Sequence, residues 1–307
     1  MLWFILGLIS FFLLAITTIA DKFLLTKTKL EPLNYAFLIS ILGAVASTVL
    51  ILFESKFSWP MGEIFTIILA GAGFFFGVYF QYLVFYDKEA TRVNSIINSM
   101  VPIFTYFMSL ALIVDHLTPI KLIGVGVIIV SSYLLSQVGQ KKDRFILGDI
   151  ALMFLAALMF AANHVFSKVV YEQMPFFDAF IWIRWSIFAV GLVYVTLIGG
   201  WGKIFPKKDK VQEPAEKASK KTQWLVLLFG QGCGAVSILL YQYAVKLGSV
   251  TLVTALQGTQ FFFMLIMAVL LTKYYPRLFR EDVSPKVLKL KIMYSILLFV
   301  GVFFILL

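Results

Sequence analysis

The sequence repeats one feature that constrains any fold it can adopt: long, uninterrupted apolar blocks separated by short polar connectors. About 20 helical residues cross the roughly 30 Å hydrocarbon core of a bilayer, so each block is long enough to span it. With 61% hydrophobic and 14% charged residues, the chain has more apolar surface than a soluble fold can bury. Ten spans are predicted, over residues 1–20, 34–53, 62–85, 93–114, 119–137, 146–170, 178–199, 223–245, 250–272 and 287–307.

These spans are expected to be helices. Lipid offers no partners for backbone N–H and C=O groups, and blocks of this length lack the alternation of barrel strands. The fold class is therefore an all-α integral membrane protein. The opening block has no basic n-region and no cleavage site before Asp21, so we expect it to remain as the first helix. Cys233 lies in an apolar block and is expected to be a small buried thiol.

The distribution of basic residues predicts the orientation. The formal net charge is +10; the odd-numbered connectors hold 21 Lys and Arg residues and the even-numbered ones four, Lys56, Lys121, Lys168 and Lys246. Basic residues stay on the cytoplasmic side, which predicts a multi-pass cell-membrane protein with both termini extracytoplasmic. The Lys-rich connector 201–222 is expected to be a solvated loop near lipid headgroups. Since the lysines lie in connectors, nucleic acid is not expected as a partner.

The chain contains an internal repeat at an offset of 161 residues. This divides it into two predicted repeats of five helices, residues 1–140 and 141–307. An odd number of spans per repeat inverts the second copy, an arrangement that suits alternating access, although membrane enzymes also arise by duplication. The matched positions are Gly71-Ala72-Gly73 with Gly232-Cys233-Gly234, and Gln81-Tyr82 with Gln242-Tyr243.

Polar residues within the spans are candidates for a substrate site, because they are costly in lipid and turn inward. Asn94 and Asn98 share one helix face with Pro102, which is expected to line a cavity. Thr254 and Gln257 occupy the corresponding turns of the second copy. Hydrogen bonding between helices is the alternative for these side chains.

Three further spans contribute candidates. Gln81, Tyr82, Gln242 and Tyr243 follow small-residue steps whose glycines are expected to serve close packing. Asn163 and His164 interrupt an otherwise apolar run. A histidine can titrate near neutral pH or donate to a substrate carboxylate; the alternative is that His164 is hydrogen-bonded to a neighbour.

The charged residues in and near the spans indicate which transport mechanisms are disfavoured. Arg184, between Trp182 and Trp185, is expected to reach the interface as an anchor rather than to bind an anion. The acidic residues near the spans fall at helix ends, which disfavours a proton relay of carboxylates at the midplane. They are Asp21, Glu54, Asp87, Asp115 and Asp178.

Catalytic patterns are missing from the sequence. It has no HExxH, GxSxG or phosphate-loop motif, and His116 lies in a connector. No enzymatic activity, cofactor or metal site is therefore expected, and the single cysteine offers no thiolate metal site.

The run EATRVNSIINSMVPIFTYFMSLALIVDHLTPIKLIGVGVIIVSSYLL, with GSVTLVTALQGTQFFFMLIMAVLL as its second copy, resembles the EamA-type branch of the drug/metabolite transporter superfamily. The resemblance implies a basket of helices one to four and six to nine around a central cavity, with helices five and ten peripheral. It also implies export of amino acids or related metabolites. The chain departs from the pattern at Phe262, which stands where the first half has Pro102, and in its charge bias.

The sequence thus predicts a secondary transporter, an exporter of a small metabolite such as an amino acid, working by alternating access. Its expected partners are that solute and the lipid bilayer; the oligomeric state stays open. Two alternatives remain at this point: a flippase for a lipid-linked headgroup, and a non-transporting membrane scaffold or enzyme.

Overall fold

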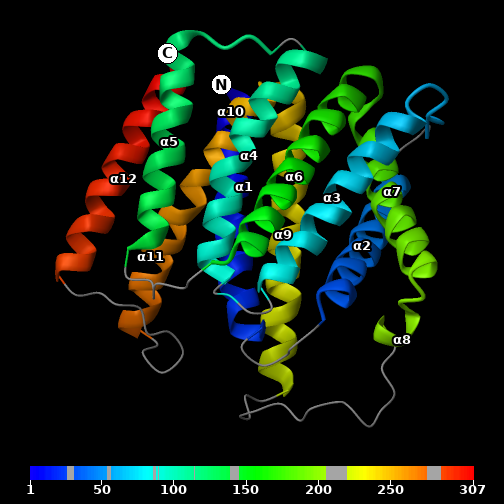
Figure 1. Cartoon of the computed structure of the whole chain (residues 1–307), viewed down its shortest axis with the longest axis horizontal. Helices are drawn as coiled ribbons and strands as arrows, with labels where there is room; N and C mark the ends of the chain where they lie inside the picture. The colour runs from blue at the N-terminus through cyan, green and yellow to red at the C-terminus, as the bar shows by residue number, and fades with distance from the viewer. Residues whose placement is uncertain are drawn as a thin grey trace.

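The computed structural model describes residues 1–25, 31–53, 57–85, 88, 90–113, 115–138, 145–204, 220–274 and 285–307. Every regular element in these ranges is a helix (Figure 1). The first half contains α1 (Leu2–Leu25), α2 (Pro32–Thr48), η1 (Val49–Phe53), α3 (Ile64–Phe85), α4 (Ala90–Leu112) and α5 (Pro119–Gln137). The second contains α6 (Leu147–Gln173), α7 (Phe176–Leu197), α8 (Trp201–Ile204), α9 (Lys220–Leu247), α10 (Val250–Ala255), η3 (Leu256–Gly258), α11 (Thr259–Tyr274) and α12 (Pro285–Leu306).

Nine segments of the described chain are long and apolar enough to cross a membrane. Two of them are composite, since α2 continues into η1, and α10, η3 and α11 follow one another in a single crossing. A tenth crossing is made by α9, which has 28 residues and packs along α1. The predicted spans agree with these elements, and the all-α fold class is confirmed.

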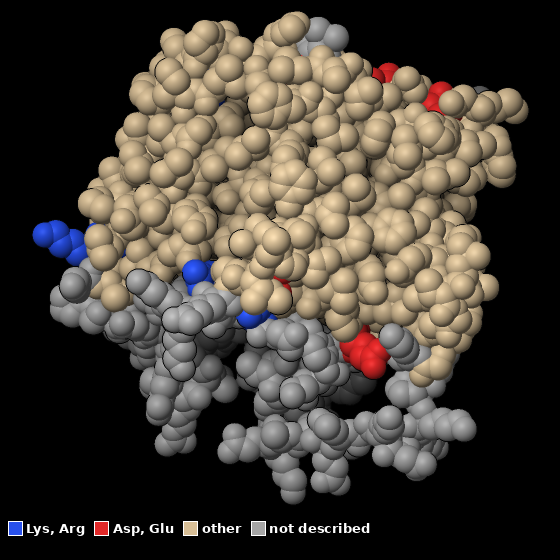
Figure 2. All heavy atoms as spheres, in the orientation of Figure 1, with Lys and Arg blue, Asp and Glu red and all other residues tan. Residues whose placement is uncertain are grey.

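The surface has the polarity of a membrane protein. On the face seen in Figure 2, the visible Lys, Arg, Asp and Glu atoms lie towards the two ends of the helices, and the surface between them is uncharged. Both termini lie at one end of the bundle, which an even number of crossings requires (Figure 1). This end also carries the even-numbered connectors, and we call it the even end.

Helices of one half pack against helices of the other half, and the pairs are related by the repeat. The pair α3–α6 is matched by α9–α1, because α1 corresponds to α6 and α3 to α9 in the repeat. The corresponding helices α2 and α7, α4 and α10, and α5 and α12 also contact each other. Such pairing is what a fold of two five-helix repeats requires.

The α5–α12 pair lies at one edge of the bundle (Figure 1). A methyl group added at Gly124 would lie 2.9 Å from the Gly301 carbonyl oxygen, and one added at Gly301 would lie 2.9 Å from that of Gly124. Small residues let membrane helices approach this closely. The sequence sets where both helices begin: Pro119 follows the N-cap Thr118, whose hydroxyl accepts a bond from Lys121 N, and Pro285 opens α12.

The predicted Lys-rich loop 201–222 is shorter than expected at both ends. Residues Trp201–Ile204 form α8, and α9 already begins at Lys220. Aromatic and apolar side chains explain the first difference, since Trp201 packs edge-on against Phe37 with ring centroids 5.9 Å apart. Most of the loop's lysines lie outside the described residues.

Candidate functional site

Ten buried side-chain N or O atoms of the described residues have no hydrogen-bond partner. Leaving such an atom unpartnered costs about 1 to 3 kcal/mol, so a concentration of them in a membrane protein calls for an explanation. They lie on α4, α6, α7, α9 and α11, and none of the ten is on the peripheral pair α5 and α12. The residues are Asn98, Thr105, Asn163, His164, Ser167, Tyr171, Asp178, Tyr241, Gln242 and Gln260.

The candidates on α3 and α4 divide into two kinds. Gln81 Nε2 donates to Asn94 Oδ1 at 2.9 Å, so this pair forms a bond between helices. Tyr82 stacks on Tyr35 of α2, with ring centroids 3.9 Å apart. Asn98, one turn beyond Asn94, is buried and its Nδ2 has no partner. Of the two asparagines, Asn98 is the one with a buried amide donor that has no partner.

The two candidates on α6 keep free polar atoms. Asn163 Nδ2 donates to the Ala70 carbonyl of α3 at 2.8 Å, which leaves its Oδ1 without a partner. His164 packs edge-on against Tyr241 of α9, with ring centroids 5.2 Å apart, and its buried Nδ1 has no partner. The alternative that a neighbour satisfies His164 therefore does not hold for Nδ1.

The candidates of the second half differ in burial and in whether their polar atoms have partners. Gln242 is buried and its Oε1 has no partner, whereas its neighbour Tyr243 is 36% exposed and packs against Phe176. Thr254 is fully buried, but its hydroxyl donates to the Thr251 carbonyl of its own helix at 2.9 Å. Gln257 is half-buried. Only Gln242 among these four combines burial with a free polar atom.

The ninth crossing is interrupted, which the sequence did not predict. The expected continuous helix 250–272 is broken by the 3₁₀ segment η3, while the proline-containing α4 is uninterrupted. Thr259 donates to the Leu256 carbonyl three residues earlier at 2.7 Å, and Gly258 packs so closely on α5 that an added methyl would lie 2.9 Å from Ser132 Cβ. A short 3₁₀ stretch within a helix often marks a hinge or a site of strain.

Arg184 does not reach the membrane interface, so the expectation of an interfacial anchor is wrong. The residue is only 6% exposed, and its guanidinium carbon lies 5.2 Å from the Phe74 ring centroid and 5.0 Å from that of Phe180. The neighbouring tryptophans take the anchoring position instead: Trp182 Nε1 donates to the Ser58 carbonyl at 3.0 Å and Trp185 Nε1 to Thr48 Oγ1 at 2.9 Å. The arginine side chain therefore lies inside the bundle, against the two phenylalanine rings.

Arg184 belongs to a cluster with three residues of α6 and α9. Its guanidinium lies within electrostatic range of His164 and Tyr171, and the Tyr171 and Tyr241 hydroxyls are in range of each other. At 1.5 Å rise per residue, Arg184 and His164 lie about 12 and 13 Å from the even end. Side chains lean towards the start of their helix, so Tyr171 leans into the membrane and meets this level. We call these four residues the Arg184 cluster.

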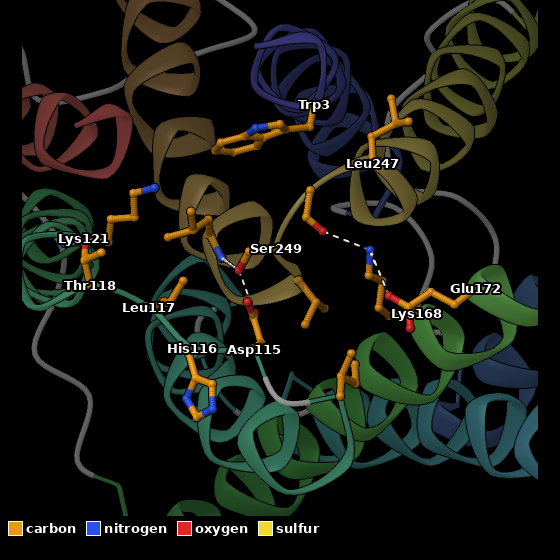
Figure 3. Close-up of a pocket in the computed structure, with 14 residues that line it drawn as sticks. Trp3, Asp115, His116, Leu117, Thr118, Lys121, Lys168, Glu172, Leu247 and Ser249 are labelled. Carbon is orange, nitrogen blue, oxygen red and sulfur yellow. Dashed lines mark hydrogen bonds and ion pairs between the residues drawn. The ribbon is translucent and has the colours of Figure 1, made fainter.

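A pocket of about 520 Å³ opens at the even end. Figure 3 shows Trp3 of α1, Asp115 of the α4–α5 connector and Lys168 of α6 around it, together with Ser249 from the turn before α10. None of the ten predicted site residues lines this pocket. Lys168 is one helical turn beyond His164, so the pocket lies one turn above the Arg184 cluster.

Polar bonds join the helix ends around the pocket (Figure 3). Lys168 Nζ donates to the carbonyls of Lys246 at 2.8 Å and Gly248 at 3.1 Å, and lies 3.4 Å from Glu172 Oε1. A cation at the carboxyl end of α9 complements its helix dipole. Ser249 Oγ donates to Asp115 Oδ2 at 2.6 Å. The sequence held one signal for this pocket, since Lys121, Lys168 and Lys246 are three of the four basic residues on the even side.

The crossings, the helix pairs between the two halves and the buried polar atoms define a polytopic helical membrane protein with the two-repeat fold of transporters. The model of the EamA-like transporter family matches residues 1–137 and 147–307, and the chain belongs to this family. Membership implies a transporter, not an enzyme. No curated protein matches the chain. One solved crystal structure shares 14% identity with a TM-score of 0.66, covering 97% of this chain and 93% of the other, which shows likeness of fold.

Proposed function

We propose that the protein is a secondary transporter that exports a small polar or amphipathic metabolite, with amino acids as the first candidates, by alternating access. Family membership supports transport. The observation that carries the proposal is the set of ten unpartnered buried polar atoms, which avoids α5 and α12. A solute with complementary donors and acceptors would satisfy these atoms and offset the cost of burying them.

The predicted residues take different roles in this proposal. Asn98, Asn163, His164 and Gln242 each keep a polar atom for the solute. The other six shape the surrounding structure, because they are bonded within the protein, stacked or partly exposed; they are Gln81, Tyr82, Asn94, Tyr243, Thr254 and Gln257.

Alternating access would use the pocket at the even end as one entrance. Beside it, Lys168 ties α6 to the end of α9 and the α9–α10 turn, and Ser249 ties that turn to Asp115 of the α4–α5 connector. Opening the path to the Arg184 cluster would break some of these bonds, and an equivalent opening at the opposite end would follow from the inverted relation of the proposed repeats, residues 1–140 and 141–307.

Flux in proteoliposomes tests this function. We expect saturable transport of at least one radiolabelled amino acid by the wild type, and a loss of about tenfold or more in Asn98→Ala and His164→Ala, because each removes a hydrogen-bonding group in a dry site. Ser295→Ala is the matched control: this buried serine on the peripheral α12 bonds the Lys291 carbonyl. Absence of flux for every solute would refute the transporter, and normal flux in both variants would refute the site.

The proposed orientation, with the termini outside, has its own test. A Cys233→Ala background would receive a single cysteine at Gly62, in an even connector, or at Gly202, at the opposite end. Both positions have no atom within 4 Å of an added Cβ. On intact cells a membrane-impermeant maleimide should label Gly62→Cys alone; labelling of Gly202→Cys alone would show that the termini are inside.

A further inference from the structure

Arg184 is a cation that no protein carboxylate neutralises among the described residues. It lies within α7, about 12 Å from the even end, and no described Asp or Glu is within ion-pair distance of it. The described carboxylates near the bundle are held elsewhere: Asp149 by Lys88, Glu172 by Lys168, Asp115 by Ser249, and Asp178 by the Ser58 backbone N–H. A buried, unpaired charge is costly, and the contacts to Phe74 and Phe180 offset only part of that cost.

The groups near Arg184 are suited to an anion. Its guanidinium is within electrostatic range of His164 and Tyr171, and His164 packs edge-on against Tyr241 with ring centroids 5.2 Å apart. Tyr171 is buried and Tyr241 is partly buried, and the hydroxyl oxygens of both are buried without a partner at hydrogen-bond distance and angle. His164 adds a ring nitrogen without a partner. A guanidinium binds carboxylate or phosphate oxygens through two parallel bonds, and hydroxyl donors can complete their coordination. No described carboxylate lies in the cluster to repel such a group.

The pocket at the even end lies near the cluster along α6, because its lining residue Lys168 is one helical turn beyond His164. The cluster lies about 12 Å from that end of the bundle. The pocket carries both signs of charge, from Lys121 and Lys168 and from Asp115 and Glu172, so it does not exclude anions.

We propose that the Arg184 cluster binds the anionic group of the transported solute, a carboxylate or a phosphate, with the guanidinium as its counterion. This inference rests on the proposed transport function and specifies its substrate class. The solute's remaining polar atoms would then face Asn98, Asn163 and Gln242. The competing explanation is that Arg184 only packs against the phenylalanine rings.

Binding in detergent tests the inference separately from transport. Thermal unfolding is measured with L-leucine, L-glutamate, inorganic phosphate or L-leucinamide at equal concentrations. We expect stabilisation by the carboxylate probes or by phosphate, and none by leucinamide, which lacks the anion. Arg184→Gln should lower the affinity for the stabilising anion about tenfold or more, and Arg184→Lys should retain part of it, since lysine keeps the charge without the planar fork.

Arg92→Gln is the matched control. Arg92 also lies over an aromatic ring, that of Phe145 at 4.7 Å, but it bonds Gln137 near the opposite end of the bundle. Arg92→Gln should leave the thermal stabilisation by the anion unchanged.

Two outcomes would overturn the inference. One is equal stabilisation by leucine and leucinamide; the other is an Arg184→Gln protein that unfolds at lower temperature yet is stabilised by the anion as much as the wild type. Anion binding without flux would refute the proposed transport and support this site. Flux without a preference for anions would support transport and refute this site.

Discussion

Helices α3 and α9 carry the same Gly-x-Gly motif but pack differently on their neighbours, since Gly73 of α3 lies against α6 and Gly71 against α7. Gly71 and Gly73 of α3 correspond to Gly232 and Gly234 of α9 at the repeat offset of 161. Both helices cross the bundle against the first helix of the other half. The comparison therefore holds the local sequence nearly constant and changes only the partner helix.

In α3 the glycines touch backbone. A methyl group at Gly73 would lie 2.6 Å from the Met159 carbonyl oxygen and 2.7 Å from Asn163 N, and one at Gly71 would lie 2.8 Å from Ser186 C of α7. The helices come this close because nothing but hydrogen occupies these positions. The Asn163 amide adds a bond to Ala70 across the same interface.

In α9 the equivalent glycines meet a side chain or nothing. A methyl group at Gly234 would lie 3.2 Å from Thr17 Cγ2, and Gly232 has no atom within 4 Å of an added Cβ. Hydroxyl bonds join these helices instead, from Thr17 to the Gly230 carbonyl at 3.2 Å and from Ser237 to the Ser10 carbonyl at 2.8 Å. A repeated motif thus permits close packing, and the partner helix decides whether it occurs.

Gly73→Ala should have the largest effect, because the new methyl overlaps the backbone of α6, which cannot rotate away. We expect a loss of about 3 kcal/mol in the free energy of unfolding. Unfolding by SDS in mixed micelles, followed by circular dichroism, measures it. A loss no greater than that of Gly234→Ala would remove the difference between the interfaces.

Gly234→Ala should cost less, about 0.5 to 1 kcal/mol, because its neighbour is a side chain that can move by a few tenths of an ångström. The same unfolding measurement applies. Combining it with Thr17→Ser, which removes the contacting methyl, should restore most of the loss; no restoration would place the strain elsewhere.

Thr17→Val should cost about 0.6 kcal/mol, the typical value of a hydrogen bond between membrane helices. It removes the hydroxyl that bonds Gly230 while nearly keeping the shape of the side chain. The informative result is a double-mutant cycle with Ser237→Ala in SDS unfolding. Additive losses would mean that the two bonds act independently along the interface.

Gly232→Ala should have the smallest effect, a gain of up to about 0.5 kcal/mol, because alanine restricts the unfolded chain and meets no neighbour. Gly71→Ala is its counterpart in α3 and should destabilise. Equal behaviour of the two variants in the same unfolding assay would contradict the asymmetry.

The number and course of the crossings followed from the sequence. Apolar block length predicted them because the hydrocarbon thickness fixes how many residues each needs, and the starts at Pro119 and Val250 agree with the structure. The interruption at η3 did not follow, because it depends on Gly258 packing against Ser132 of α5, a contact between segments distant in the sequence.

The candidate site was predictable only in part. Asn98, Asn163, His164 and Gln242 were marked by polarity within apolar blocks, and all four are buried with a free polar atom. Polarity alone did not separate them from Asn94, whose oxygen is bonded to Gln81, or from Tyr243 at the surface. Arg184 was misjudged because its depth in the helix did not reveal which way its side chain points.

By itself, the sequence determined that the chain is a helical membrane protein with two related halves, since apolar length, charge placement and the repeat act locally along the chain. The tertiary structure alone decided which polar atoms are paired, how closely each glycine approaches its neighbour, and that Arg184 is buried against Phe74 and Phe180. These properties depend on the direction and distance of residues on other helices. A one-dimensional pattern does not specify those distances, because many arrangements of ten helices satisfy the same hydropathy.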